Sequence, residues 1–127
     1  MKDILIIEDD DIMLKAINNI LNKNGYKVVT ARNGKEGMEI FDRGNFALVI
    51  TDMMMPYTNG LEVISHVKSH DSGGEVGLIV VSSIGSEDSI LEAFRLGADD
   101  YLKKPIMPAE LLIRIKKILN DKSNSLI

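Results

Sequence analysis

The segment VITDMMMPYTNG, which runs from Val49 to Gly60, decides how this chain folds. It completes an apolar run that starts at Phe46 and ends on one acidic residue, Asp52. Three methionines and a proline follow. An apolar run of this length, closed by proline and glycine, is typical of a buried strand that ends abruptly. The segment therefore predicts a buried strand over 46–51 with Asp52 held at the edge of a sheet.

Strand and helix signals alternate on both sides of this segment. Near-continuous apolar runs predict strands that are buried on both faces, and apolar residues at helical spacing predict the intervening helices. Five strands alternating with five helices indicate an α/β fold, a parallel sheet covered on both faces. The predicted strands cover 4–7, 27–30, 46–51, 78–82 and 99–103, and the helical patterns cover 12–21, 38–41, 61–67, 86–96 and 111–119.

Length and composition narrow the class of protein. The 127 residues, 45% of them hydrophobic, predict one domain over 1–121, with 122–127 as a tail or the start of a linker. The chain has no cysteine, which excludes disulfides, zinc–thiolate sites and cysteine nucleophiles. No apolar stretch approaches the ~18 residues that span a bilayer, and residues 1–8 are too short for a signal peptide. We expect a cytoplasmic protein that does not bind a membrane.

The charge balance argues against nucleic-acid binding. The net charge is −4, and the basic residues that gather between Lys103 and Lys122 fit a solvated helix face and a helix C-terminus. A nucleic-acid-binding domain needs a broad basic face. We therefore expect no direct contact between this chain and nucleic acid.

Polar residues stand where the predicted strands end. In a parallel sheet with helices on both faces, sites form outside the carboxyl ends of the strands. Carboxylates, hydroxyls and ammonium groups would therefore share one rim. The residues are Glu8, Asp9, Asp10 and Asp11 after the first strand, Asp52 after the third, Ser82 and Ser83 at the fourth, and Lys103 and Lys104 at the fifth.

This combination predicts a site that handles a phosphoryl group. Clustered carboxylates repel one another, and Mg²⁺, which prefers oxygen ligands, would relieve that repulsion and also bind phosphate oxygens. A lysine and a serine hydroxyl can contact a phosphoryl oxygen. Asp52 is the candidate nucleophile, because an aspartate can form an acyl phosphate.

Four motifs in order resemble the receiver domain of two-component response regulators, a CheY-like family. They are ILIIEDDD at 4–11, DMMMPYTNG at 52–60, VVSS at 80–83 and GADDYLKKP at 97–105. The resemblance covers about residues 3 to 120. It implies a flavodoxin-like three-layer sandwich with strand order 2-1-3-4-5, and a cis bond before Pro105.

The resemblance also implies a phosphoacceptor and a metal site. Asp52 would take a phosphoryl group from a phosphohistidine on a histidine kinase or phosphotransfer protein. Asp9 and Asp52 would bind Mg²⁺, with Glu8 acting through water and Met54 through its backbone carbonyl. The family catalyses only its own phosphotransfer and autodephosphorylation, so we expect a regulatory domain rather than an enzyme.

Three further residues are implied in the switch. Lys104 would contact the phosphoryl group, Ser82 would move to hydrogen-bond it, and Tyr101 would turn inward behind Ser82. The face formed by the fourth helix, fifth strand and fifth helix would then change. Tyr101, Glu110 and Arg114 also fit family members that dimerise through this face.

Several residues have competing interpretations. Asp10 and Asp11 fit an N-cap and first-turn charge for the first helix. Lys103 and Ser83 are the neighbours that could replace Lys104 and Ser82. His66 and His70 could take part in phosphotransfer or be ordinary surface residues. Met53, Met54 and Met55 could form a soft-metal site or serve as packing.

Three other functions remain open. A phosphohydrolase of the haloacid-dehalogenase type would need an aspartate where Met54 stands, and an FMN binder would not place four acidic residues after its first strand. A receiver used only as an unphosphorylated binding module is the third. Met54 and Ile84 lie two residues after Asp52 and Ser82, where they could flank a phosphoryl group. Both are apolar and cannot orient an attacking water, so we expect a phosphorylated form to lose its phosphate slowly.

Overall fold

The computed structural model describes residues 2–55, 58–70, 75–83 and 85–124. Within them, no helix is both long enough and apolar enough to cross a membrane. The described strands are β1 (Asp3–Ile7), β2 (Val28–Ala31), β3 (Phe46–Asp52), β4 (Gly77–Ser82) and β5 (Asp100–Lys103). The described helices are α1 (Asp11–Lys23), α2 (Gly34–Arg43), α3 (Gly60–Ser69), α4 (Glu87–Leu96) and α5 (Pro108–Asn124).

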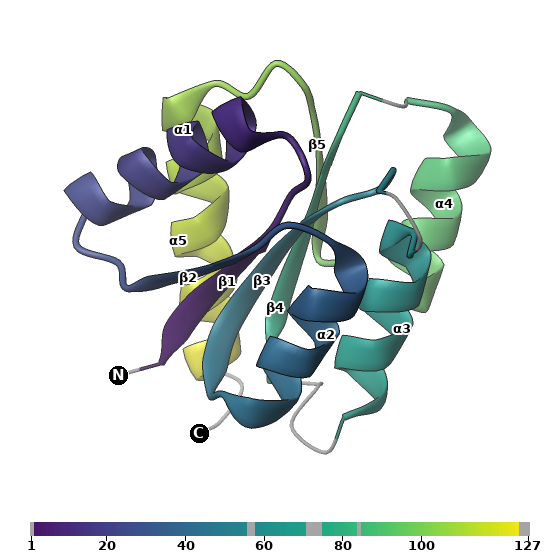
Figure 1. Cartoon of the computed structure of the whole chain (residues 1–127), viewed down its shortest axis with the longest axis horizontal. Helices are drawn as coiled ribbons and strands as arrows, with labels where there is room; N and C mark the ends of the chain where they lie inside the picture. The colour runs from purple at the N-terminus through teal and green to yellow at the C-terminus, as the bar shows by residue number, and fades with distance from the viewer. Residues whose placement is uncertain (1, 56–57, 71–74, 84, 125–127) are drawn as a thin grey trace.

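The strands form one parallel sheet in the order β2-β1-β3-β4-β5, which confirms the predicted fold (Figure 1). β3 lies in the centre, and its residues Thr51 and Asp52 pair with Val80 and Val81 of β4. The strand order reverses between β1 and β3, so the chain leaves these two adjacent strands in different directions. A crevice for a ligand forms at such a switch point.

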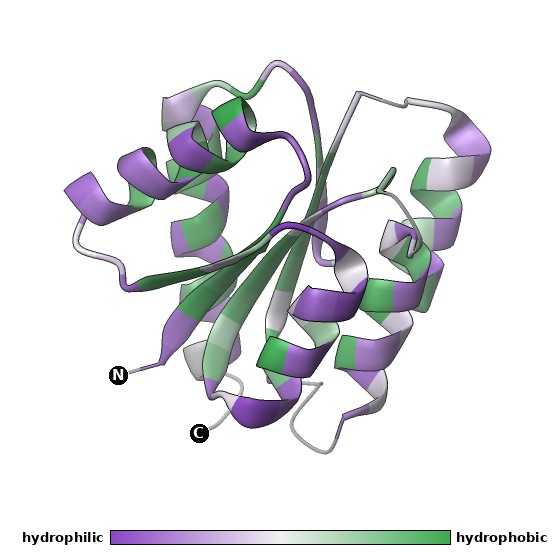
Figure 2. Ribbon diagram, in the orientation of Figure 1, coloured by the Kyte–Doolittle hydropathy of each residue, from purple (hydrophilic) through white to green (hydrophobic). Residues whose placement is uncertain are grey.

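Two apolar layers hold the helices to the sheet. Figure 1 shows α1 and α5 on one face and α2, α3 and α4 on the other, and Figure 2 shows the apolar strands between them. Along β1, Ile4 and Ile6 pack toward α1 and α5, while Leu5 and Ile7 pack toward the opposite helices. This alternation buries both faces of each central strand, which is why these strands are continuously apolar.

Helix ends follow the local signals in the sequence. Asp10 caps α1, and its carboxylate accepts hydrogen bonds from the N–H groups of Ile12 and Met13 at 2.9 and 3.3 Å. Ser86 caps α4, and Gly97 ends it with a φ of 118°, a left-handed conformation that favours glycine. These caps confirm the predicted N-cap role of Asp10 and the predicted bounds of the fourth helix.

The last helix is longer than the sequence pattern indicated. We expected a frayed tail from Asp121, but α5 continues to Asn124. The Nζ atom of Lys122 lies 3.2 Å from an oxygen of Asp99, whose other oxygen accepts a hydrogen bond from the Leu78 N–H at 2.9 Å. This ion pair ties the end of α5 to Asp99, directly before β5, and the hydrogen bond from Leu78 links Asp99 to the start of β4; helical periodicity reveals neither contact.

Gly60 explains how the chain turns after β3. Its N–H donates to the Met53 carbonyl at 2.8 Å, which places the start of α3 directly against the end of the strand. A Cβ atom at this position would lie 2.6 Å from the Asp52 carbonyl oxygen and 2.8 Å from the Met53 Cα. Both neighbours are backbone atoms and cannot rotate away, so only glycine fits without a shift of the strand end.

A substitution at Gly60 should therefore destabilise the fold. We expect Gly60→Ala to lower the free energy of unfolding by ~1–3 kcal/mol, the usual cost of forcing an extra carbon into a packed site. Urea unfolding followed by circular dichroism measures this difference.

Gly85→Ala is the matched control, because a Cβ there would meet the Lys103 side chain only at 3.6 Å. We expect it to change stability by less than ~1 kcal/mol. Equal effects of the two substitutions would contradict the proposed close approach at Gly60.

Candidate functional site

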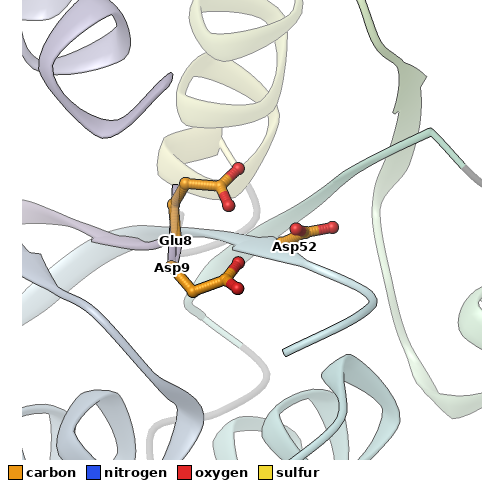
Figure 3. Close-up of side chains that lie close together, drawn as sticks. All are labelled: Glu8, Asp9 and Asp52. Atoms are coloured by element: carbon orange, nitrogen blue, oxygen red, sulfur yellow. The ribbon is translucent and has the colours of Figure 1, made fainter. Parts of the chain in front are cut away.

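Three carboxyl groups meet where β1 and β3 end. Figure 3 shows Glu8 and Asp9 from the residues after β1 beside Asp52 from the end of β3. One ligand oxygen from each of these residues lies within 4.8 Å of the others. Glu8 and Asp52 are buried, with 2% and 7% of their surface exposed, whereas Asp9 is exposed. The predicted acidic cluster therefore exists and opens to solvent on the side of Asp9.

Lys104 supplies the positive charge at this cluster. Its Nζ atom lies 2.6 Å from Glu8 Oε1 and 3.2 Å from Asp52 Oδ2. Lys103, the competing lysine, is exposed, and its side chain lies beside Gly85 of the β4–α4 loop. Lys103 is the last residue of β5 and Lys104 follows it directly, and successive side chains along an extended chain point to opposite sides, which accounts for the different directions of the two lysines. The peptide bond after Lys104 is cis, as the family resemblance implied.

The electrostatics of the cluster depend on burial. The pKa of the Glu8 carboxyl is raised to about 7, chiefly because burial disfavours its charged form; the hydrogen bond with Lys104 opposes this rise and the nearby Asp52 charge adds to it. Burial alone would lower the pKa of the Lys104 ammonium, but its contacts with Glu8 and Asp52 raise it above the usual value. The lysine is therefore charged, while Glu8 exchanges its proton near neutral pH.

The two oxygens of Asp52 have different surroundings. Oδ1 accepts hydrogen bonds from the backbone N–H groups of Met53 at 2.7 Å and Met54 at 3.4 Å. Oδ2 is the oxygen that contacts Lys104. The backbone that follows β3 and the lysine that follows β5 therefore fix the orientation of this carboxylate.

The predicted switch residues lie on neighbouring strands. Ser82 is buried at the end of β4, and its carbonyl accepts a hydrogen bond from the Lys104 N–H at 2.9 Å, whereas Ser83 is exposed. Tyr101 of β5 is half-buried and packs against the core beneath α2, α3 and α4. Ser82 and Tyr101 thus occupy adjacent strands, and their roles in switching stay predictions.

The three methionines after Asp52 point in different directions. Met53 is 5% exposed within the core, and Met55 is half-buried against it, so both serve as packing. Met54 is 61% exposed. Pro56 and Ile84, which we associated with the turn and with the phosphate lifetime, lie outside the described residues.

The histidines do not join this site. His66, near the end of α3, lies 2.7 Å from an Asp42 carboxylate oxygen, and its ring packs edge-on against Phe41. His70 also contacts the Phe41 ring. Both belong to the packing between α2 and α3 and not to the carboxyl rim of the sheet.

The donor set suits a hard divalent cation. Glu8, Asp9 and Asp52 offer only carboxylate oxygens, the ligands that Mg²⁺ prefers, and the exposed Asp9 leaves access for water and a phosphate. One contact was missed in the sequence, namely that between Lys104 and Glu8. It joins residues 96 positions apart, and no local pattern signals such a pair.

Solved structures and curated proteins are similar to this chain in fold and in sequence. A receiver domain protein from Methanospirillum hungatei matches with a TM-score of 0.91 and 30% identity over 98% of both chains. The BeF₃-activated receiver domain of DrrB matches with a TM-score of 0.84 and 31% identity, over 94% of this chain and 98% of that one. The transcriptional regulatory protein SrrA of Staphylococcus aureus is 31% identical over 117 residues, 92% of this chain.

The match to SrrA covers 47% of that protein, so this chain spans about half the length of this relative. The family model of the response regulator receiver domain matches residues 4–116, which include all ten strands and helices in whole or in part. The chain therefore belongs to the response regulator receiver domain family, whose members are regulatory domains of two-component signalling.

Proposed function

We propose that this domain is a phosphorylation switch in which Asp52 accepts a phosphoryl group. The observation that carries the proposal is the contact between Lys104 Nζ and Asp52 Oδ2 at 3.2 Å, inside a cluster of carboxylates. An aspartate held by a lysine at the open end of a sheet can act as a nucleophile, and the ammonium can balance the charge of an incoming phosphate. The donor would be a phosphohistidine on a histidine kinase or phosphotransfer protein.

The transfer requires few groups from the chain. A carboxylate oxygen of Asp52 forms a bond to phosphorus while the phosphorus–nitrogen bond of the donor breaks, and the donor imidazole keeps the electron pair and takes a proton. Lys104 stabilises charge on the phosphoryl oxygens, and the N–H groups of Met53 and Met54 orient the aspartate.

Glu8, Asp9, Asp52 and the backbone carbonyl of Met54 would hold Mg²⁺ at this site. The bound ion would neutralise carboxylate and phosphoryl charge. Protonation of Glu8 would weaken the site at low pH, because a protonated carboxyl group is a poor cation ligand.

The phosphoryl group would change the α4-β5-α5 face. It adds ~1.5–2 negative charges and three hydrogen-bond acceptors, toward which the Ser82 hydroxyl would move, followed by Tyr101. The activation of DrrB by BeF₃ supports such a response in a relative of the same fold. Two exposed apolar side chains on α4, Leu91 and Phe94, would belong to the altered surface.

A second copy of the chain is the partner that we propose for this face. Ile113 of α5 is also exposed and apolar, and Arg114 is anchored to Asp100 of β5 by an ion pair of 3.0 Å. Tyr101 and Glu110 lie on the same elements. Exposed apolar side chains with charged neighbours fit a contact with another protein surface.

Phosphorylation itself is the first prediction. Incubation with acetyl phosphate and Mg²⁺ should add one labile group of about 80 Da to the protein, as measured by intact mass, and Asp52→Asn should abolish it. Asp11→Asn is the control, because Asp11 is exposed and pairs with Arg32 instead. An unmodified wild-type mass with both acetyl phosphate and a phosphohistidine donor would leave only an unphosphorylated binding module.

The second prediction concerns pH. Folded Glu8 keeps its proton up to about pH 7, whereas the ordinary value is 4.5, so the folded state binds more protons between these values. The stability of the metal-free protein should therefore fall as the pH rises from 5 to 8. Relative to Glu8→Gln, the fall should reach ~3 kcal/mol at most.

Thermal unfolding in EDTA at pH 5, 6, 7 and 8 tests this difference, with Glu8→Gln as the reference for every other titrating group. Added Mg²⁺ should raise the melting temperature of the wild type more at pH 8 than at pH 5. A constant difference between the two proteins across this range would show that Glu8 titrates at its ordinary value.

The third prediction concerns the lifetime of the phosphate. Met54 is exposed and apolar and cannot hold an attacking water, so Met54→Asn should dephosphorylate faster. One added hydrogen bond to that water corresponds to about a fivefold change in rate. The decay of the mass adduct after removal of the donor measures the rate, and an unchanged rate would contradict the prediction.

A further inference from the structure

Met54 is an exposed methionine beside the proposed phosphoacceptor. The residue is 61% exposed, whereas the flanking Met53 is 5% exposed and Met55 is half-buried. Its backbone N–H lies 3.4 Å from Asp52 Oδ1, so the residue is held next to the carboxylate. Of the three consecutive methionines, the middle one alone is largely exposed to solvent.

The composition of the chain makes an exposed methionine its most readily oxidised side chain. The chain has no cysteine, so methionine sulfur is the side-chain group that peroxide oxidises most readily. Among the described residues, Met107 in the segment between β5 and α5 is the other methionine exposed above one half, at 65%. Met54 and Met107 therefore form a matched pair with similar access to solvent and different positions relative to Asp52.

We propose that Met54 is a peroxide-sensitive modification site that controls how long Asp52 stays phosphorylated; this inference rests on the proposed function. The sulfur lone pair attacks one oxygen of the peroxide, an S–O bond forms and the O–O bond breaks. The departing hydroxide takes the proton of the new sulfur-bound hydroxyl group and leaves as water. The thioether is oxidised to a sulfoxide and the peroxide is reduced.

The sulfoxide changes the chemistry next to the phosphoryl group. A thioether is a weak hydrogen-bond acceptor, whereas a sulfoxide oxygen is polar and accepts a hydrogen bond from water. A water held in this way is oriented for attack on the phosphorus atom, which breaks the bond between phosphorus and the Asp52 oxygen. Oxidation at Met54 should therefore shorten the phosphate lifetime by about fivefold, the effect of one hydrogen bond on a rate.

The experiment uses the whole chain in three forms, wild type, Met54→Leu and Met107→Leu. Each protein is treated with limiting hydrogen peroxide, freed of it with catalase, and then loaded with acetyl phosphate and Mg²⁺. Peptide mass spectrometry locates the sulfoxides, and intact mass follows the loss of phosphate. Each oxidised protein is compared with its own untreated sample, so any effect of the substitution itself cancels.

The inference predicts early oxidation of Met54 and Met107 before Met53 and Met55. It also predicts a lifetime about fivefold shorter after peroxide in wild type and Met107→Leu, no change in Met54→Leu, and recovery after treatment with methionine sulfoxide reductase. Three results would overturn it: a Met54 that resists oxidation, an unchanged lifetime with Met54 oxidised, or a shortened lifetime that persists in Met54→Leu. Failure of the untreated wild type to become phosphorylated by either acetyl phosphate or a phosphohistidine donor would overturn the proposed function itself, and this inference with it.

Discussion

The site depends on the Lys104 ammonium group, which two buried carboxyl groups share. The Lys104 ammonium contacts Glu8 at 2.6 Å and Asp52 at 3.2 Å, and both carboxylates are buried at the end of the sheet. Two buried carboxylates side by side would otherwise repel each other or stay protonated. The lysine holds them together, and its own charge is stabilised by them in return. The phosphate or cation that we propose would enter a site whose charges are already oriented.

The sheet makes this concentration of charge possible. The central parts of β1, β3 and β4 are apolar on both faces, so the charged groups of the site lie at or beyond the strand ends. Because the strands are parallel, their carboxyl ends meet at one edge. Carboxyl groups from the ends of β1 and β3 lie within a few ångströms of one another, and Lys104, which follows β5, contacts two of them. The apolar core that stabilises the domain also excludes water beneath Glu8, which is the physical cause of its raised pKa.

The turn after β3 is tightly packed at Gly60, whereas the Met54 side chain in the same turn is exposed. Gly60 is confined by backbone atoms of Asp52 and Met53, so α3 begins directly against the strand end. Between them, Met53 and Met55 face the core while Met54 faces solvent. The backbone at position 54 is therefore held beside the aspartate, whereas its side chain is free to vary or to be modified without disturbing the core.

The sequence by itself determined the α/β class, the positions of the strands and several caps, such as Asp10 and Ser86. These features depend on local apolar periodicity and capping chemistry. Tertiary structure decided which charges meet. Two ion pairs join residues that are distant in the chain, Lys104 with Glu8 and Lys122 with Asp99. The second of these lies near the end of α5, which extends further than the sequence pattern predicted. The exposure of Met54 between two packed methionines was also decided there, because periodicity cannot assign a direction to each side chain after a strand ends.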